Sequence, residues 1–222
     1  MTARLDPADP QSAQQFILEN TKPIAPPLVP EIMLRLAEES LPIWQKSEDE
    51  LGELNVPPPY WAFAWAGGQA VSRYLLDHPE ICRGRTVLDI GAGSGISAIA
   101  AAKTGAIRVL AADIDGLAVA ACAVNAGANG VAIETTLADL LDAEPPQGSV
   151  VILGDLFYER QLATRVTQYI DRAKERGCSV YIGDPRRSYF PENRFTPLAE
   201  YQVPVTRELE DYDIKRTTVW GG

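Results

Sequence analysis

Short apolar runs alternate with helical stretches along most of the chain. Five apolar runs are predicted to form buried strands, over residues 86–90, 108–113, 131–135, 149–153 and 179–182. The helical stretches cover residues 67–77, 97–103, 116–128 and 160–176, and Gly177 gives the last one a natural stop. Apolar strands that alternate with helices indicate a parallel sheet covered on both faces. The pattern therefore predicts an α/β fold with a doubly wound, mostly parallel sheet.

The two ends of the chain depart from this alternation. Residues 201–209 and 214–220 have β character with no helix between them, so we expect an antiparallel hairpin that completes a seven-stranded sheet, with acidic residues 208–213 at its tip.

Residues 1–59 are irregular and are predicted to form a helical extension that packs on a core of residues 60–222 and covers one side of its pocket. We expect short helices over residues 9–20 and 31–40, separated by a proline-rich stretch that can be neither helix interior nor central strand. An acidic turn over residues 47–54 follows. A flexible arm is the alternative for this segment.

Composition excludes several classes of protein. The 222 residues carry 20 Lys and Arg against 30 Asp and Glu, a net charge of −10, which disfavours a nucleic-acid partner. This charge suits a cationic partner, or serves solubility alone. No apolar run is long enough to span a membrane, and no signal peptide is recognisable, so we expect a cytoplasmic protein. One histidine and three scattered cysteines argue against a metal site, and we expect a monomer.

A glycine-rich turn follows the first strand of the sheet. Gly91-Ala92-Gly93-Ser94-Gly95 runs directly into a helix, so a ligand can approach the backbone beside free N–H donors. A dinucleotide-binding turn would place its third glycine at position 96, which is Ile96. The second strand ends in Asp113, where an acid can hold the two hydroxyls of a ribose.

Residues 87–95 resemble the first motif of class I S-adenosylmethionine-dependent methyltransferases, and the resemblance extends over about residues 60–222. It implies a Rossmann-like fold and S-adenosylmethionine as cofactor. Asp113 matches the ribose-binding acid, with Asp115 as a weaker substitute, and Asp139 matches a loop beside the adenine or is a solvated acid. The resemblance implies a cofactor site made of Trp65, Asp89, Gly91, Ala92, Gly93, Gly95, Asp113, Asp139, Leu140 and Gly154.

Two further segments narrow the family. The Asp-x-x-Tyr from Asp155 to Tyr158, after the fourth strand, resembles a motif of the seven-β-strand protein lysine methyltransferases. Residues 58–69 resemble the electron transfer flavoprotein β-subunit lysine methyltransferases, although Ala66 stands where a proline is common. In that branch, the tryptophan aligned with Trp65 helps to enclose the cofactor.

The resemblance implies catalytic roles for Asp155 and Tyr158. Asp155 can attract and orient the substrate ammonium, while Trp61, Phe157 and Tyr158 can line its channel through cation–π contacts. Core packing is the alternative for Trp61, Phe63 and Trp65. Arg186 and Arg187 follow the fifth strand and either contact an acidic protein surface or form a solvated pair.

The leading hypothesis is a protein-lysine N-methyltransferase acting on the electron transfer flavoprotein β subunit, with the ribosomal stalk protein as a further substrate. A methyltransferase for a small amine such as nicotinamide is a second reading. A third is a non-catalytic binding module that keeps the fold as a scaffold.

Overall fold

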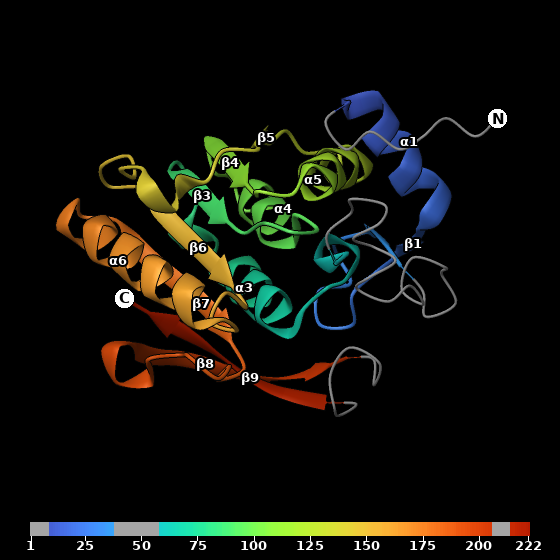
Figure 1. The fold of residues 1–222 in the computed structure, drawn as a ribbon. Helices are drawn as coiled ribbons and strands as arrows, with labels where there is room; N and C mark the ends of the chain where they lie inside the picture. The colour runs from blue at the N-terminus through green and yellow to red at the C-terminus, as the bar shows by residue number, and fades with distance from the viewer. Residues whose placement is uncertain (1–8, 38–57, 206–213) are drawn as a thin grey trace.

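A computed structural model describes residues 9–37, 58–205 and 214–222. Its main feature is a seven-stranded sheet in the order β5-β4-β3-β6-β7-β9-β8 (Figure 1). Strands β3 to β7 pair in parallel, whereas β9 runs antiparallel to both β7 and β8. The strands are β3 (Thr86–Ile90), β4 (Arg108–Ala112), β5 (Glu134–Thr136), β6 (Val150–Gly154), β7 (Ser179–Asp184), β8 (Thr196–Pro204) and β9 (Ile214–Gly221).

Helices cover both faces of this sheet, which confirms the predicted doubly wound arrangement with its C-terminal hairpin. The helices are α3 (Ala66–Asp77), α4 (Ile96–Lys103), α5 (Gly116–Ala128) and α6 (Arg160–Glu175). Val87 and Ile152 pack in one apolar cluster with residues of α3 and α4. Their neighbours Leu88 and Val151 join a second cluster with α6, because successive strand residues point to opposite faces.

Two strand boundaries differ clearly from the prediction. The first strand of the hairpin, expected from residue 201, already begins at Thr196. The expected strand over residues 131–135 forms instead as β5, at Glu134–Thr136. Val131 donates its N–H to the Ala126 carbonyl at the end of α5, so the first apolar residue of the run belongs to the helix end. In the described ranges, short 3₁₀ turns connect the elements at Tyr60–Ala62, Pro79–Ile81, Leu140–Asp142 and Glu192–Arg194.

The helix predicted over residues 9–20 is confirmed as α1 (Pro10–Asn20), which Asp9 caps by accepting the N–H of Ser12 at 3.0 Å. It lies beside α5, and its buried Ala13 and Ile17 pack against Leu117 (Figure 1).

The second predicted helix, over residues 31–40, is wrong for the part that the structure describes. Leu34–Leu36 forms β2, which pairs antiparallel with β1 (Lys22–Ile24). Ile32, Leu34 and Leu36 are buried, whereas Arg35 turns away and donates to the Thr21 carbonyl at 2.8 Å. The burial therefore alternates with the period of a strand. The rest of this prediction, the acidic turn and the hairpin tip fall outside the described residues.

None of the described helices combines the length and the apolar character that crossing a membrane requires.

Candidate functional site

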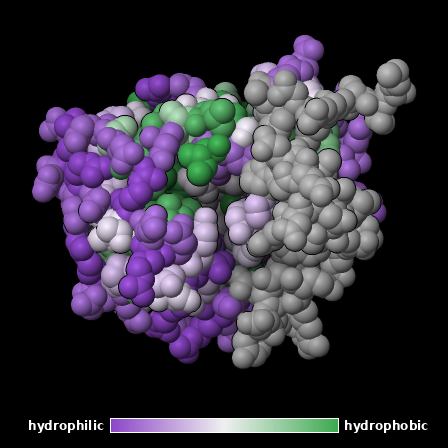
Figure 2. Space-filling model, in the orientation of Figure 1, coloured by the Kyte–Doolittle hydropathy of each residue, from purple (hydrophilic) through white to green (hydrophobic). Residues whose placement is uncertain are grey.

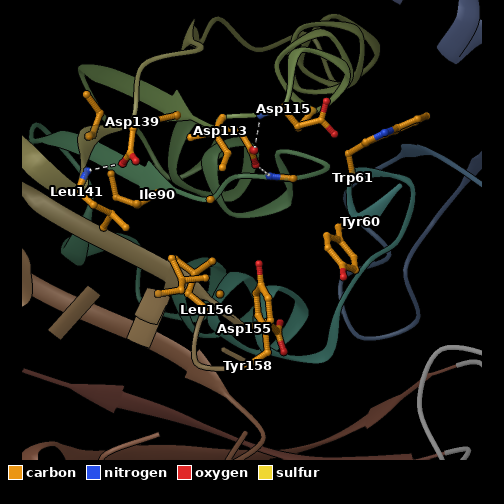
Figure 3. Close-up of a pocket in the computed structure, with 18 of the residues that line it drawn as sticks. Tyr60, Trp61, Ile90, Asp113, Asp115, Asp139, Leu141, Asp155, Leu156 and Tyr158 are labelled. Atoms are coloured by element: carbon orange, nitrogen blue, oxygen red, sulfur yellow. Dashed lines mark hydrogen bonds between the residues drawn. The ribbon is translucent and has the colours of Figure 1, made fainter. Parts of the chain in front are cut away.

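A cavity of about 420 Å³ opens at the carboxyl ends of β3, β4 and β6, a size that suits a small-molecule ligand. In Figure 3, Asp113 and Asp115 lie on one side of it, Asp155 and Tyr158 on the other, and Tyr60 and Trp61 come from the segment before α3. Figure 2 shows hydrophobic residues gathered near the hollow of this face, in the region where Figure 1 draws β4 and β5. The predicted site residues that line the cavity are Trp61, Trp65, Gly91, Gly93, Asp113, Asp139, Leu140, Gly154, Asp155 and Tyr158.

The glycine turn forms one wall of the cavity. Gly93 has a φ of 52°, and a Cβ there would meet only the Trp61 Cα, at 3.9 Å, so a ligand can approach the backbone. At Gly95, in contrast, a Cβ would come within 3.1 Å of the Cys122 Cα and Sγ. Gly93 therefore serves ligand access, and Gly95 serves the packing of the turn against α5.

Asp113 is presented to the cavity by backbone donors. Its carboxylate accepts the Gly93 N–H at 2.9 Å and the Asp115 N–H at 3.0 Å. Burial raises the pKa of Asp113, while these N–H groups oppose the shift. The Asp115 carboxylate instead caps α5 through the Leu117 N–H at 2.9 Å, which favours Asp113 as the ligand-binding acid.

Asp89, Ala92 and Gly95 do not line the cavity, although the sequence placed them in the cofactor site. Asp89 is buried behind the glycine turn and accepts the Ala98 N–H, at 2.9 Å, in the first turn of α4. Burial, with the nearby Asp113 carboxyl, raises the pKa of Asp89 to about 7. Asp89 thus links the end of β3 to the first turn of α4, because a carboxyl group satisfies a free N–H donor of a helix start.

Asp139 lies at the rim of the cavity. It accepts the Leu141 N–H at 3.0 Å and pairs with Arg165 at 2.8 Å, so both its oxygens shape the loop, and Leu140 lines the cavity beside it.

Asp155 follows β6 in a left-handed backbone conformation, with a φ of 61°. Its Oδ2 accepts the Gly68 N–H of α3 at 3.0 Å. Its Oδ1 accepts two donors of Arg187, Nε at 3.0 Å and Nη2 at 2.6 Å. The start of α3 reaches this carboxylate because Gly67 lies against Gly183 at the end of β7, where a Cβ on Gly67 would come within 2.1 Å of the Gly183 oxygen.

Aromatic side chains form the wall beside Asp155. Tyr60 has ring-centroid distances of 6.0 Å to both Trp65 and Tyr158, and the Trp65 indole N–H donates to the Tyr60 carbonyl at 2.8 Å. The Arg187 guanidinium lies 5.5 Å from the centre of the Trp65 ring. A carboxylate and an aromatic face therefore already hold one cation between them.

The prediction that Phe157 lines a substrate channel requires a correction, because Phe157 does not line the cavity. Its side chain is fully buried, with its ring edge-on to Phe190 at 5.0 Å, so it serves the core. Trp61 does both: it touches the cavity, yet it is almost fully buried against Ile17 and Leu117.

Sequence reasoning missed Arg187 as the ion-pair partner of Asp155. A signal was present, since Arg187 follows β7 and Asp155 follows β6, and neighbouring parallel strands end at the same edge of a sheet. Tyr60, Leu156 and Arg165 also line the cavity without having been predicted there. No cluster of His, Cys, Asp or Glu in the described ranges is placed to hold a metal ion.

Comparison with known proteins adds to this geometry. Residues 72–169 match a family model described as ribosomal protein L11 methyltransferase (PrmA). The electron transfer flavoprotein beta subunit lysine methyltransferase of Xenopus laevis is 39% identical over 213 residues, which cover 93% of this chain and 85% of that protein.

Solved structures share the fold. Ribosomal protein L11 methylase of Lactobacillus delbrueckii subsp. bulgaricus has a TM-score of 0.52 at 23% identity, over 72% of this chain and 79% of that one. Magnesium protoporphyrin IX methyltransferase of Synechocystis PCC 6803, solved with bound S-adenosylmethionine, has a TM-score of 0.52 at 17% identity, over 70% and 79% of the two chains.

Proposed function

The chain belongs to the family of electron transfer flavoprotein β-subunit lysine methyltransferases, and from this premise we propose that it methylates lysine of that flavoprotein subunit. It is an enzyme that depends on S-adenosylmethionine. The observation that carries the proposal is Asp155, a carboxylate at the end of β6 that lies in the same cavity as Asp113.

The residues present fit the cofactor. The open backbone at Gly93 and the acceptor oxygens of Asp113 suit a ribose, while Ile114, Leu140 and Leu141 offer an apolar slot for an adenine ring. When bound, S-adenosylmethionine supplies a methyl group on a positively charged sulfur, already activated for attack.

The chain's own residues then position the substrate nitrogen. Asp155 accepts an N–H of the lysine amine, which turns the nitrogen lone pair toward the methyl carbon. With the cofactor bound, the amine nitrogen held by Asp155 would be the acceptor of its methyl group, and the proton of the product amine would leave to water. Tyr60, Trp65 and Tyr158 form an aromatic wall of the site beside this position.

The test is incubation of the enzyme with methyl-labelled S-adenosylmethionine and recombinant electron transfer flavoprotein β subunit, followed by mass spectrometry of the lysines. We expect label on lysine of the β subunit. Label on nicotinamide and on no protein would support a small-amine enzyme, and cofactor binding without any transfer would support a binding module. Ribosomal stalk protein in a parallel reaction tests the second substrate that we propose.

Two lesser proposals concern the cellular location and the oligomeric state of the enzyme. We place the enzyme in the cytoplasm, because Cys82, Cys122 and Cys178 are free and buried, as expected in a reducing compartment. We also propose that it works as a monomer, which light scattering at the assay concentration would test.

A further inference from the structure

Asp155 has a cationic partner within the chain itself. Arg187 donates two hydrogen bonds to the Asp155 Oδ1, from Nε at 3.0 Å and from Nη2 at 2.6 Å, and its guanidinium lies over the Trp65 ring. The Asp155 side chain is 9% exposed and that of Arg187 18%, so water screens the pair only weakly. Under the proposed function, this same carboxylate has to meet the substrate lysine.

Arg187 is held in place by the end of β7. Its backbone N–H donates to the Asp184 Oδ1 at 2.7 Å, and Asp184 is completely buried. Burial, and then the Asp155 charge, raise the pKa of Asp184 to about 7. Asp184 therefore carries less negative charge at neutral pH than an ordinary aspartate, and competes only weakly with Asp155 for the positive charge of Arg187. Tyr158 lines the same cavity, and the charged and ionisable groups that act on it include Tyr60, Asp113, Glu159 and Arg187 itself.

The charge of this pair decides which form of lysine the cavity prefers. A lone Asp155 carboxylate would stabilise an ammonium ion, in which the lone pair is tied to a proton and cannot attack. With Arg187 bound, the two charges cancel, while Asp155 keeps its carboxylate oxygens. An amine can donate an N–H to such an oxygen without carrying a charge.

We propose that Arg187 neutralises Asp155, so that the cavity accepts the substrate lysine as the neutral amine rather than as the ammonium ion. The inference rests on the proposed function. The free lysine is protonated at neutral pH, so its proton leaves to solvent as the complex forms. Arg187 is then a positioning residue: it acts on the nucleophile through Asp155 and sets the protonation state of the bound amine.

The first test counts protons and needs no turnover. The full-length enzyme, loaded with S-adenosylhomocysteine, is titrated with the β subunit by calorimetry in buffers of different ionisation heat. The pH is set between the ordinary ranges of carboxyl and ammonium groups. The blank is a β subunit whose methylated lysine is replaced by methionine. We expect the wild type to release about one proton per complex above the blank, and Arg187→Met to release less than about half of that.

The second test is kinetic. Because only the neutral amine reacts, kcat rises with pH as the bound lysine loses its proton. Arg187→Met moves this rise to higher pH by about one unit or more, since an opposite charge shifts a pKa by about 1–3 units. Its KM near neutral pH falls, because the abundant ammonium form now binds directly. A less basic amine, aminoethylcysteine in place of the lysine, lowers the midpoint in every variant and so assigns it to the amine rather than to Asp184.

Conservative variants separate charge from structure. Arg187→Lys keeps the charge and should keep both the proton count and the pH midpoint. Arg187→Gln, which keeps donors without charge, repeats the test if the methionine variant does not fold. Arg186→Met is the matched control, because its guanidinium pairs with Glu192 and lies over the Trp220 ring, outside the cavity lining.

The inference is overturned if the charge-removing variants lower kcat by the same factor at every pH and release as many protons as the wild type. If the wild type methylates no protein lysine at all, the proposed function fails instead, and the two failures are told apart by that assay.

Discussion

Two acids at the strand ends face each other across one cavity, and they are held in different ways (Figure 3). Asp113, after β4, accepts only backbone N–H groups, and no ion pair within the described residues reaches it. Asp155, after β6, accepts one backbone N–H and the forked guanidinium of Arg187. An acid held by neutral donors suits neutral hydroxyl partners, whereas an acid with its own counter-ion suits a site that handles cations. The difference supports our proposal that Asp113 marks the cofactor side of the cavity and Asp155 the substrate side.

The sharpest way to break this comparison is Asp155→Asn. The amide keeps the shape but loses the charge that holds Arg187 and an acceptor for the amine. We expect methyl transfer to fall by about 10²–10³-fold. Cofactor affinity should change by less than about threefold, because Asp155 lies on the other side of the cavity. Steady-state kinetics and cofactor calorimetry measure the two quantities. Asp171→Asn, which removes a surface acid paired with Arg194, is the control.

Asp113→Asn should show the opposite profile. One amide oxygen cannot replace a carboxylate that accepts two N–H groups and a ligand, so we expect cofactor affinity to fall by about 10–100-fold. At saturating cofactor, kcat should stay within about threefold of the wild type. Asp115→Asn is the control, since asparagine caps a helix about as well as aspartate, and it should change both stability and cofactor affinity little. Equal affinities for both variants would refute the assignment of Asp113.

Gly67→Ala tests how the substrate side is built. A Cβ on Gly67 would lie 2.1 Å from the Gly183 oxygen and 2.5 Å from the Asp155 Oδ2, so α3 has to move away from β7. We expect a loss of about 1–3 kcal/mol in the free energy of unfolding, measured in urea. Gly127→Ala is the matched control, because nothing lies within 4 Å of its Cβ, and it should stabilise α5 by up to about 1 kcal/mol. Similar stability changes in the two variants would mean that the close contact between Gly67 and Gly183 does not contribute to stability.

The sheet could be predicted because its signals are local. Each buried strand is a short apolar run, and the glycine turn lies directly after β3. The helix over residues 31–40 was predicted wrongly because Ile32 and Leu36, four residues apart, satisfy the helical period and the strand period alike. The deciding contacts are distant: Arg35 donates its backbone N–H to Asn125 of α5 at 2.7 Å. The local pattern of apolar residues cannot indicate a hydrogen-bond partner as distant in the sequence as Asn125.

The site, too, could be predicted only in part. The end of the second strand indicated Asp113, and the resemblance to a family motif indicated Asp155. Neither indicated the guanidinium that Asp155 binds, because Arg187 lies 32 residues further along the chain. The choice between Phe157 and Tyr158 as the residue facing the cavity depends on the turn after β6, where Asp155 adopts its positive φ. That conformation is fixed by tertiary contacts with α3 and β7, so the sequence alone could not decide it.

A pH-dependent effect concerns Asp184, the third acid, which lies beside Arg187. Its pKa of about 7 in the folded state is above the ordinary value near 3.9 that it has when unfolded. The folded state therefore binds more protons between about pH 4 and 7, and this carboxyl lowers stability as the pH rises through that window, by at most about 1.4 kcal/mol per pH unit. Asp184→Asn removes this slope, while the other buried acids contribute equally to both proteins.

Urea unfolding at a series of pH values should therefore show the two stabilities diverging in favour of the variant as the pH rises from about 4 to 7. The Asp184 Oδ2 has no hydrogen-bond partner in the part of the chain that the structure describes. The cost of burying the charged carboxylate is therefore not offset at this oxygen. Parallel curves would mean that Arg187 compensates Asp184 as well as Asp155. The Arg187 charge would then act on two acids. Asp155 would no longer differ from Asp113 by having a counter-ion of its own.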